Sequence, residues 1–146
     1  MLIAVSTLIL AGVAVFLALR WGGRPEHWGA RVIVAMILLT YAGHAFFPRL
    51  FRSVDPVALA VDIVGLIGFT AIGLTYRRVW PLWAASLQLL SSGAHFVRAL
   101  SIPIEGRAYF WMKTSPTWIV MVLLIAGTLA HQQRVRQRRN ESSLPD

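Results

Sequence analysis

The sequence contains no cysteine, and only 14% of its 146 residues are charged. The absence of cysteine excludes disulfide bonds, thiolate metal sites, iron–sulfur clusters and cysteine nucleophiles. Soluble domains carry about 25% charged residues, whereas here apolar residues make up 57% of the chain. No polar block is long enough to form a core of its own. This composition favours a single domain embedded in lipid.

Acidic residues are especially scarce, with 6 Asp and Glu against 14 Lys and Arg and a net charge of +8. Such a basic balance is typical of nucleic-acid-binding proteins. Here, however, the basic residues fall mostly in short connections between apolar runs, which is the pattern of membrane topology signals. We therefore expect the partners to be the lipid bilayer and its anionic headgroups, and we expect no nucleic acid.

Five apolar stretches approach the roughly 20 residues that a helix needs to cross a bilayer. They predict an all-α, polytopic transmembrane helix bundle in which short connections make consecutive helices antiparallel neighbours. Residues 1–133 are expected to form the transmembrane domain, followed by a basic, partly disordered cytoplasmic tail at 134–146. The spans are predicted at residues 2–19, 31–47, 56–75, 79–100 and 108–130.

The fifth predicted span contains Pro116 and Lys113. A proline inside a helix removes a hydrogen bond and bends the helix, so we expect a kink near Pro116 and an outward-reaching Lys113. The alternative is a four-span protein whose last segment lies in the membrane interface.

The tryptophans and the basic residues both bear on topology. All six Trp residues fall at predicted span boundaries, where amphipathic rings favour the headgroup level. With five spans, nine basic residues share one side with the C-terminus and five lie on the other, which predicts a cytoplasmic C-terminus and an outside N-terminus. The nine are Arg20, Arg24, Arg31, Arg77, Arg78, Arg134, Arg136, Arg138 and Arg139. The five are Arg49, Arg52, Arg98, Arg107 and Lys113.

The last four arginines of the first group, Arg134, Arg136, Arg138 and Arg139, follow the fifth span directly. Basic residues beside a membrane attract anionic lipid by about 1 kcal/mol each. We therefore expect these four side chains to contact lipid headgroups as well as to fix the orientation.

Three ionisable residues lie inside predicted spans: His44, Asp62 and His95. At ~1.5 Å per residue they sit about 6, 9 and 7.5 Å from the outer ends of their helices, so three helices place a polar residue at one level. Gln88, Ser91, Ser92, His95 and Arg98 add one polar stripe along the fourth span, and Tyr41 lies one turn before His44. The predicted intramembrane polar cluster comprises His44, Asp62, His95, Gln88, Tyr41 and Arg98.

This cluster allows three interpretations. In the first, Asp62 pairs with one histidine and fixes helix packing, because an unpaired acid in lipid is costly. In the second, His44 and His95 are the axial ligands of a haem b in an electron-transfer protein. In the third, Asp62 and the histidines form a relay in a proton-coupled small transporter. The sequence predicts no metal site.

No nucleophile elbow, Walker loop, dinucleotide fingerprint or HExxH motif is present, which favours a non-enzymatic protein. The leading hypothesis is an accessory or assembly subunit of a membrane complex, with a membrane-protein partner or a second copy of the chain.

The segment from Trp80 to Leu90, WPLWAASLQLL, followed by His95, resembles a segment of uncharacterised small multi-pass bacterial inner-membrane proteins. The resemblance extends over roughly the middle two-thirds of the chain. It implies a multi-pass protein of the bacterial inner membrane and assigns no activity.

Overall fold

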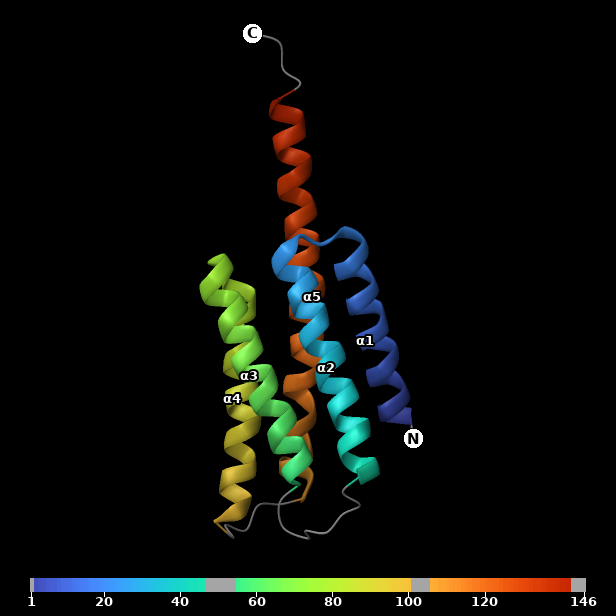
Figure 1. Ribbon diagram of the computed structural model, residues 1–146, viewed down its shortest axis with the longest axis vertical. Coiled ribbons are helices and arrows are strands. Elements are labelled where there is room, and N and C mark those ends of the chain that lie inside the picture. The colour runs from blue at the N-terminus through green and yellow to red at the C-terminus, as the bar shows by residue number, and fades with distance from the viewer. Residues whose placement is uncertain (1, 47–54, 101–105, 143–146) are drawn as a thin grey trace.

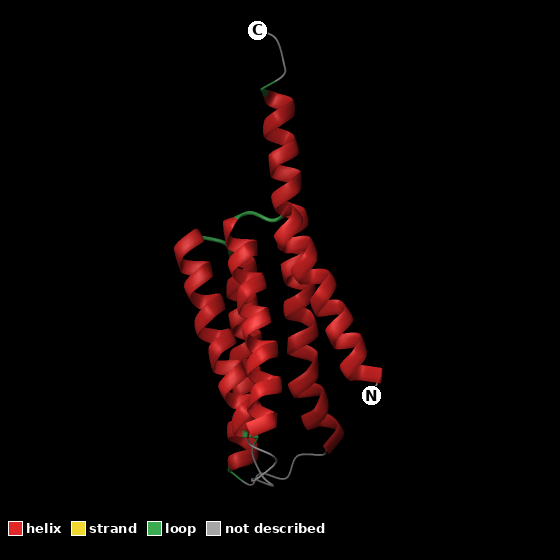
Figure 2. Cartoon of the chain, turned by 45° about the vertical axis from the view of Figure 1, so that its right-hand side comes forward, coloured by secondary structure: helices red, strands yellow, loops and turns green. Residues whose placement is uncertain are grey.

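The computed structural model describes residues 2–46, 55–100 and 106–142, except for the side chains of residues 2–4, 98–99, 106–110 and 112–114. These residues form five helices, and Figure 2 shows that the described part of the chain is helical almost throughout. The helices are α1 (Leu2–Trp21), α2 (Arg24–Phe46), α3 (Pro56–Tyr76), α4 (Val79–Ala99) and α5 (Gly106–Glu141).

Consecutive helices run antiparallel, and each packs against the next (Figure 1). Helix α5 also packs against α1, so the five helices close into a bundle. The all-helical bundle predicted from the sequence is therefore confirmed. Because α5 lies alongside α1 and α4 rather than across an end of the bundle, it is an integral part of the packing.

Three of the described helical segments are long and apolar enough to cross a membrane: Arg24–Phe46, Pro56–Tyr76 and Ser115–Glu141. The described apolar part of α1, Val5–Trp21, is shorter. Helix α4 is not among these three segments. It carries a row of polar side chains that includes Gln88 and His95.

The connection between α1 and α2 is shorter than the predicted one, which left residues 20–30 outside the spans. Helix α2 instead begins at Arg24, directly after Gly22 and Gly23. The N–H of Gly23 donates to Glu26 Oε2 at 2.9 Å, the half of a capping box in which a glutamate reaches back to the residue that precedes the helix. Pro25, in the first turn, also favours a helix start here.

The ends of α3 have identifiable caps. Asp55 precedes the helix, and its Oδ1 accepts the N–H groups of Val57 and Ala58 at 3.1 and 3.2 Å. At the other end Arg77 adopts the left-handed conformation, with φ 50°, and its N–H donates to the carbonyl of Gly73. This cap reverses the chain within two residues, so α4 starts at Val79 beside the helix that precedes it.

Helix α5 runs without interruption through Pro116 to Glu141 and projects well beyond the other helices (Figure 1). The helix therefore continues eleven residues past the predicted end of the fifth span at residue 130, and residues 134–141 of the predicted tail are helical. Between Thr128 and Glu141 there is neither Gly nor Pro. Arg and Gln, which are common in this stretch, are good helix formers.

Trp80, near the start of α4, is packed between two other helices. A Cβ added to Gly29 of α2 or to Gly127 of α5 would lie 2.6 or 2.8 Å from atoms of the Trp80 indole. The ring also meets Phe69 of α3 edge-on, with centroids 6.3 Å apart. Glycine at these two positions therefore allows α2, α4 and α5 to approach each other around one rigid aromatic ring.

Replacing Gly127 with alanine tests this packing. Gly127→Ala would force the Trp80 ring to move, and overpacking of this kind costs about 1–3 kcal/mol. Alanine recovers up to about 1 kcal/mol of helix propensity, so we expect a net destabilisation of about 1–2 kcal/mol, measured by thermal unfolding. The control is Gly12→Ala, where nothing lies within 4 Å of the added Cβ; its stability should be unchanged or slightly raised. Equal melting temperatures for the two variants would contradict this account of the packing.

Candidate functional site

The candidate site lies between α3 and α4, towards the end of the bundle where α3 begins and α4 ends. Four polar side chains of α4 are buried there, with 1%, 2%, 4% and 1% of their surface exposed. They are Gln88, Ser91, Ser92 and His95. Their spacing of three or four residues places them on one face of the helix, which explains how a single interface can bury all four.

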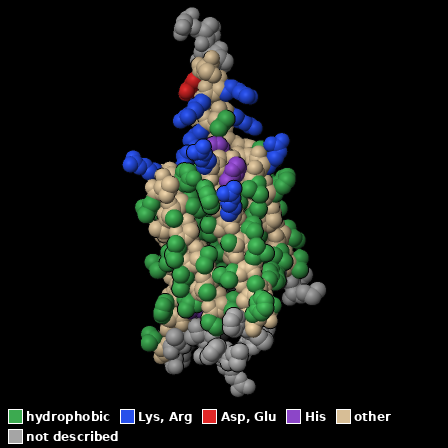
Figure 3. Space-filling model, in the orientation of Figure 1, with side chains coloured by type: hydrophobic (Ala, Val, Ile, Leu, Met, Phe, Trp, Pro, Cys, Tyr) green, Lys and Arg blue, Asp and Glu red, His purple; other side chains and the backbone are tan. Residues whose placement is uncertain are grey.

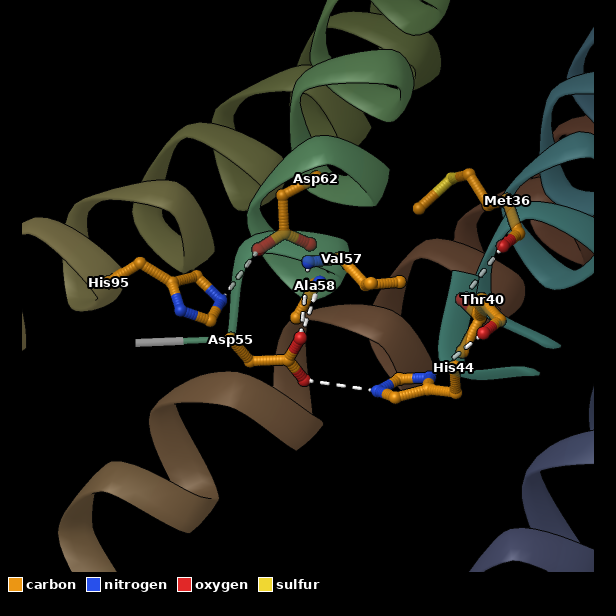
Figure 4. A network of polar contacts seen from close by, with 8 residues as sticks. All are labelled: Met36, Thr40, His44, Asp55, Val57, Ala58, Asp62 and His95. Atoms are coloured by element: carbon orange, nitrogen blue, oxygen red, sulfur yellow. Dashed lines mark hydrogen bonds and ion pairs between the residues drawn. The ribbon is translucent and has the colours of Figure 1, made fainter. Parts of the chain in front are cut away.

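Asp62 of α3 is the acidic group that this face contacts. Its Oδ2 accepts a hydrogen bond from Ser91 Oγ at 2.6 Å and lies 3.5 Å from His95 Nε2. Figure 4 shows the His95 ring of α4 pointing towards the Asp62 carboxylate. The Asp62 side chain is 11% exposed and that of His95 is 1% exposed. The carboxylate and the imidazole are therefore close enough to contact each other across the α3–α4 interface.

Two more donors face the same region without a partner in the described part of the chain. They are Gln88 Nε2 and Ser92 Oγ. Gly65 of α3 lies against the Gln88 carboxamide, because a Cβ at Gly65 would be 3.0 Å from Gln88 Cδ. A buried donor left unbonded costs about 1–3 kcal/mol. The site therefore holds more buried donors than the Asp62 carboxylate satisfies.

His44, predicted to join this cluster, lies apart from it. Its Nε2 is 3.2 Å from Asp55 Oδ2, and its Nδ1 is 2.8 Å from the carbonyl oxygen of Thr40. The His44 side chain is 43% exposed. It therefore ties the end of α2 to the capping residue of α3 (Figure 4) instead of reaching Asp62.

Two other predicted members of the cluster have different outcomes. Tyr41 is 57% exposed, so it lies on the outer surface of α2. The side chain of Arg98 is outside the described residues, as are those of Arg107 and Lys113, and Arg49 and Arg52 lie outside them altogether.

The haem hypothesis required His44 and His95 to face each other across a ring. The structure directs His44 Nε2 at Asp55 and His95 Nε2 at Asp62, with both carboxylates lying between the two histidines (Figure 4). The two imidazoles therefore do not form an axial pair in this arrangement. Among the described residues, no group of three or more His, Cys, Asp or Glu side chains is placed to hold a metal ion.

A second buried acid, Glu26, was missed by the sequence reasoning, which assigned it to a connection. Glu26 is 0% exposed, and its Oε1 accepts the indole N–H of Trp80 at 3.3 Å. The signal that could have revealed it is a glutamate three residues after Gly23 and just before an apolar helix, the position from which a glutamate can reach back to the N–H of the N-cap residue. Glu26 and Asp62 therefore contact α4 at two separate points, one near its start and one in its second half.

Comparisons of the chain with protein-family models, with curated proteins and with solved structures find no match.

The hydrogen bond between Ser91 and Asp62 can be tested by deleting its donor. Ser91→Ala leaves a buried carboxylate with one partner fewer, so we expect a loss of about 1–3 kcal/mol in the free energy of unfolding. Ser86→Ala is the matched control in the same helix, because Ser86 is exposed and bonds only the carbonyl of Leu82. The control should change stability by less than about 0.5 kcal/mol. Losses of the same size in both variants would argue against the Ser91–Asp62 bond.

Proposed function

We propose that the chain is a multi-pass protein of the bacterial inner membrane whose five helices all cross the bilayer. Its C-terminus lies in the cytoplasm and its N-terminus outside. Within the membrane it acts as a non-enzymatic accessory or assembly subunit of a larger complex.

The observation that carries the membrane proposal is the apolar outer surface of the bundle. Each helix exposes large apolar side chains: Phe16, Leu38, Ile67, Leu89 and Val122 are 64%, 64%, 64%, 60% and 54% exposed. Figure 3 shows apolar side chains covering the length of the visible face. Soluble monomers rarely expose contiguous apolar patches beyond a few hundred Å², so hydrocarbon is the solvent that suits this surface.

The two ends of the bundle support the orientation. Arginine side chains gather at the end from which α5 projects (Figure 3). Trp21 and Trp28 are exposed at this end. Trp111, near the start of α5, is 64% exposed and precedes His131 by 20 residues, or about 30 Å of helix. That length equals the hydrocarbon thickness of a bilayer.

The accessory role is supported by where the polar groups lie. Asp62, Ser91 and His95 contact each other inside the bundle, which suits a structural role in fixing the α3–α4 interface. Outside the bundle, α5 continues as an exposed helix bearing Arg134, Arg136, Arg138 and Arg139. This extension is available to anionic lipid headgroups near the bundle and to another subunit further out.

Topology can be measured by single-cysteine labelling, because the chain has no cysteine of its own. In cells, the thiols of Arg77→Cys and Ser142→Cys should react only with a maleimide that crosses the membrane, whereas the thiol of Arg52→Cys should react with an impermeant maleimide. The membrane fraction should also retain the protein after carbonate extraction. Labelling of Ser142→Cys from outside would overturn the orientation, and release by carbonate would overturn the membrane proposal.

The subunit role is tested by purification from native membranes in mild detergent at native expression levels. A partner protein recovered in a constant molar ratio is expected. Recovery of the chain alone would contradict the role of an accessory subunit without affecting the membrane topology.

A second candidate function, proton-coupled transport, is favoured by one contact: the 3.5 Å separation of Asp62 Oδ2 and His95 Nε2 in a buried site. Ionisable pairs within membrane helices are common in proton relays. In liposomes carrying a pH-sensitive dye, Asp62→Asn should reduce proton flux to the level of empty liposomes. Asp55→Asn is the control, since asparagine caps a helix as well as aspartate does, and its flux should be unchanged. Equal flux in the two variants, or none with the unmodified protein, would dispose of this candidate.

A further inference from the structure

A groove of about 300 Å³ lies between α1 and α2. Its walls are mainly apolar: Val15 and Leu19 come from α1, and Val34, Ala35 and Leu38 come from α2. One charged residue, Arg31, also lines it. Since Leu19, Val34 and Leu38 are exposed, the groove opens on the outer surface of the bundle.

The groove is polar at one end and apolar at the other. Arg31 lies seven residues from the start of α2, which is at the arginine-rich end of the bundle, and Leu38 lies seven residues further, about 10 Å deeper. Helix α1 runs in the opposite direction, so its Leu19 is nearer the arginine-rich end than Val15 is. A molecule seated along the groove would therefore meet a positive charge first and hydrocarbon side chains beyond it.

Arg31 is free to bind an external anion. Its guanidinium carbon lies 4.6 Å from the centroid of the Trp28 ring, a stacking contact that orients the group and leaves its N–H donors available. Neither of the two ion pairs found among the described residues involves Arg31. Tryptophan beside a basic side chain is typical of the level of lipid headgroups.

We propose that this groove is a binding site for one phospholipid with an anionic headgroup. The phosphate accepts hydrogen bonds from Arg31 beside Trp28, and one acyl chain lies along Leu19, Val34, Ala35 and Leu38. This inference rests on the proposed membrane topology, which puts Arg31 near the cytoplasmic headgroups.

Charge complementarity favours lipid over a second copy of the chain. A symmetric dimer through this groove would use the same surface on both copies and would bring two Arg31 side chains towards each other. An anionic lipid instead supplies the opposite charge at the end of the groove that needs it.

The test uses the full chain in nanodiscs made from equal amounts of phosphatidylglycerol and phosphatidylcholine, followed by native mass spectrometry. We expect one phosphatidylglycerol to be retained in preference to phosphatidylcholine. Arg31→Gln should lower this retention about fivefold, the effect of removing one basic residue near anionic lipid. Ala35→Phe should lower it by filling the groove; Ala35 is exposed, so the larger side chain should leave the fold intact. Arg77→Gln removes an equal charge away from the groove and should leave retention unchanged.

Three outcomes would overturn the proposal: equal retention in all four proteins, no preference for phosphatidylglycerol, or a dimer without bound lipid that Ala35→Phe dissociates. Because only protein already shown to resist carbonate extraction enters this experiment, each of these failures is distinct from a failure of the membrane topology.

Discussion

The packing of the helices depends on one constraint: a carboxylate that is buried in the bundle needs a hydrogen-bonding partner there. Two acids are buried among the residues that the structure describes, and each is bound by a side chain of α4. Glu26 accepts the Trp80 indole N–H near the start of the helix, and Asp62 accepts the Ser91 hydroxyl two-thirds of the way along it. Breaking a buried pair by removing one partner is strongly destabilising. The two contacts therefore hold α4 in register with α2 and α3 at separate points along its length.

Much of the fold was predictable because apolar run length and helix-breaking residues are properties of local sequence. The predicted spans at 56–75 and 79–100 match α3 and α4 to within one residue at each end, since Asp55-Pro56 and Arg77-Arg78 mark those boundaries clearly. The beginning of α2 was missed by seven residues, because Arg24 and Glu26 were taken as connection residues. In fact Glu26 bonds the first turn and is buried by Trp80, a contact 54 residues away in the chain that local composition does not reveal.

The candidate site shows the limit of reasoning from depth. Counting residues from the helix ends placed His44, Asp62 and His95 at one level, and all three do lie towards the same end of the bundle. Depth, however, does not give the direction in which a side chain points around the helix axis. His95 shares a face with Gln88 and Ser91 and is buried at the α3–α4 interface, whereas His44 is directed at the capping carboxylate of Asp55. Only helix packing decides between these directions.

The continuity of α5 has a mechanical consequence. The packed part of this helix contacts α1 and α4, and residues 131–141, exposed from Gln133 onward, continue the same helix for about 15 Å. No glycine or proline lies between Thr128 and Glu141 to act as a hinge. A tilt of about 10° in the packed part would thus move the tip of the helix by about 3 Å. The extension therefore transmits rearrangements of the bundle to whatever contacts its far end.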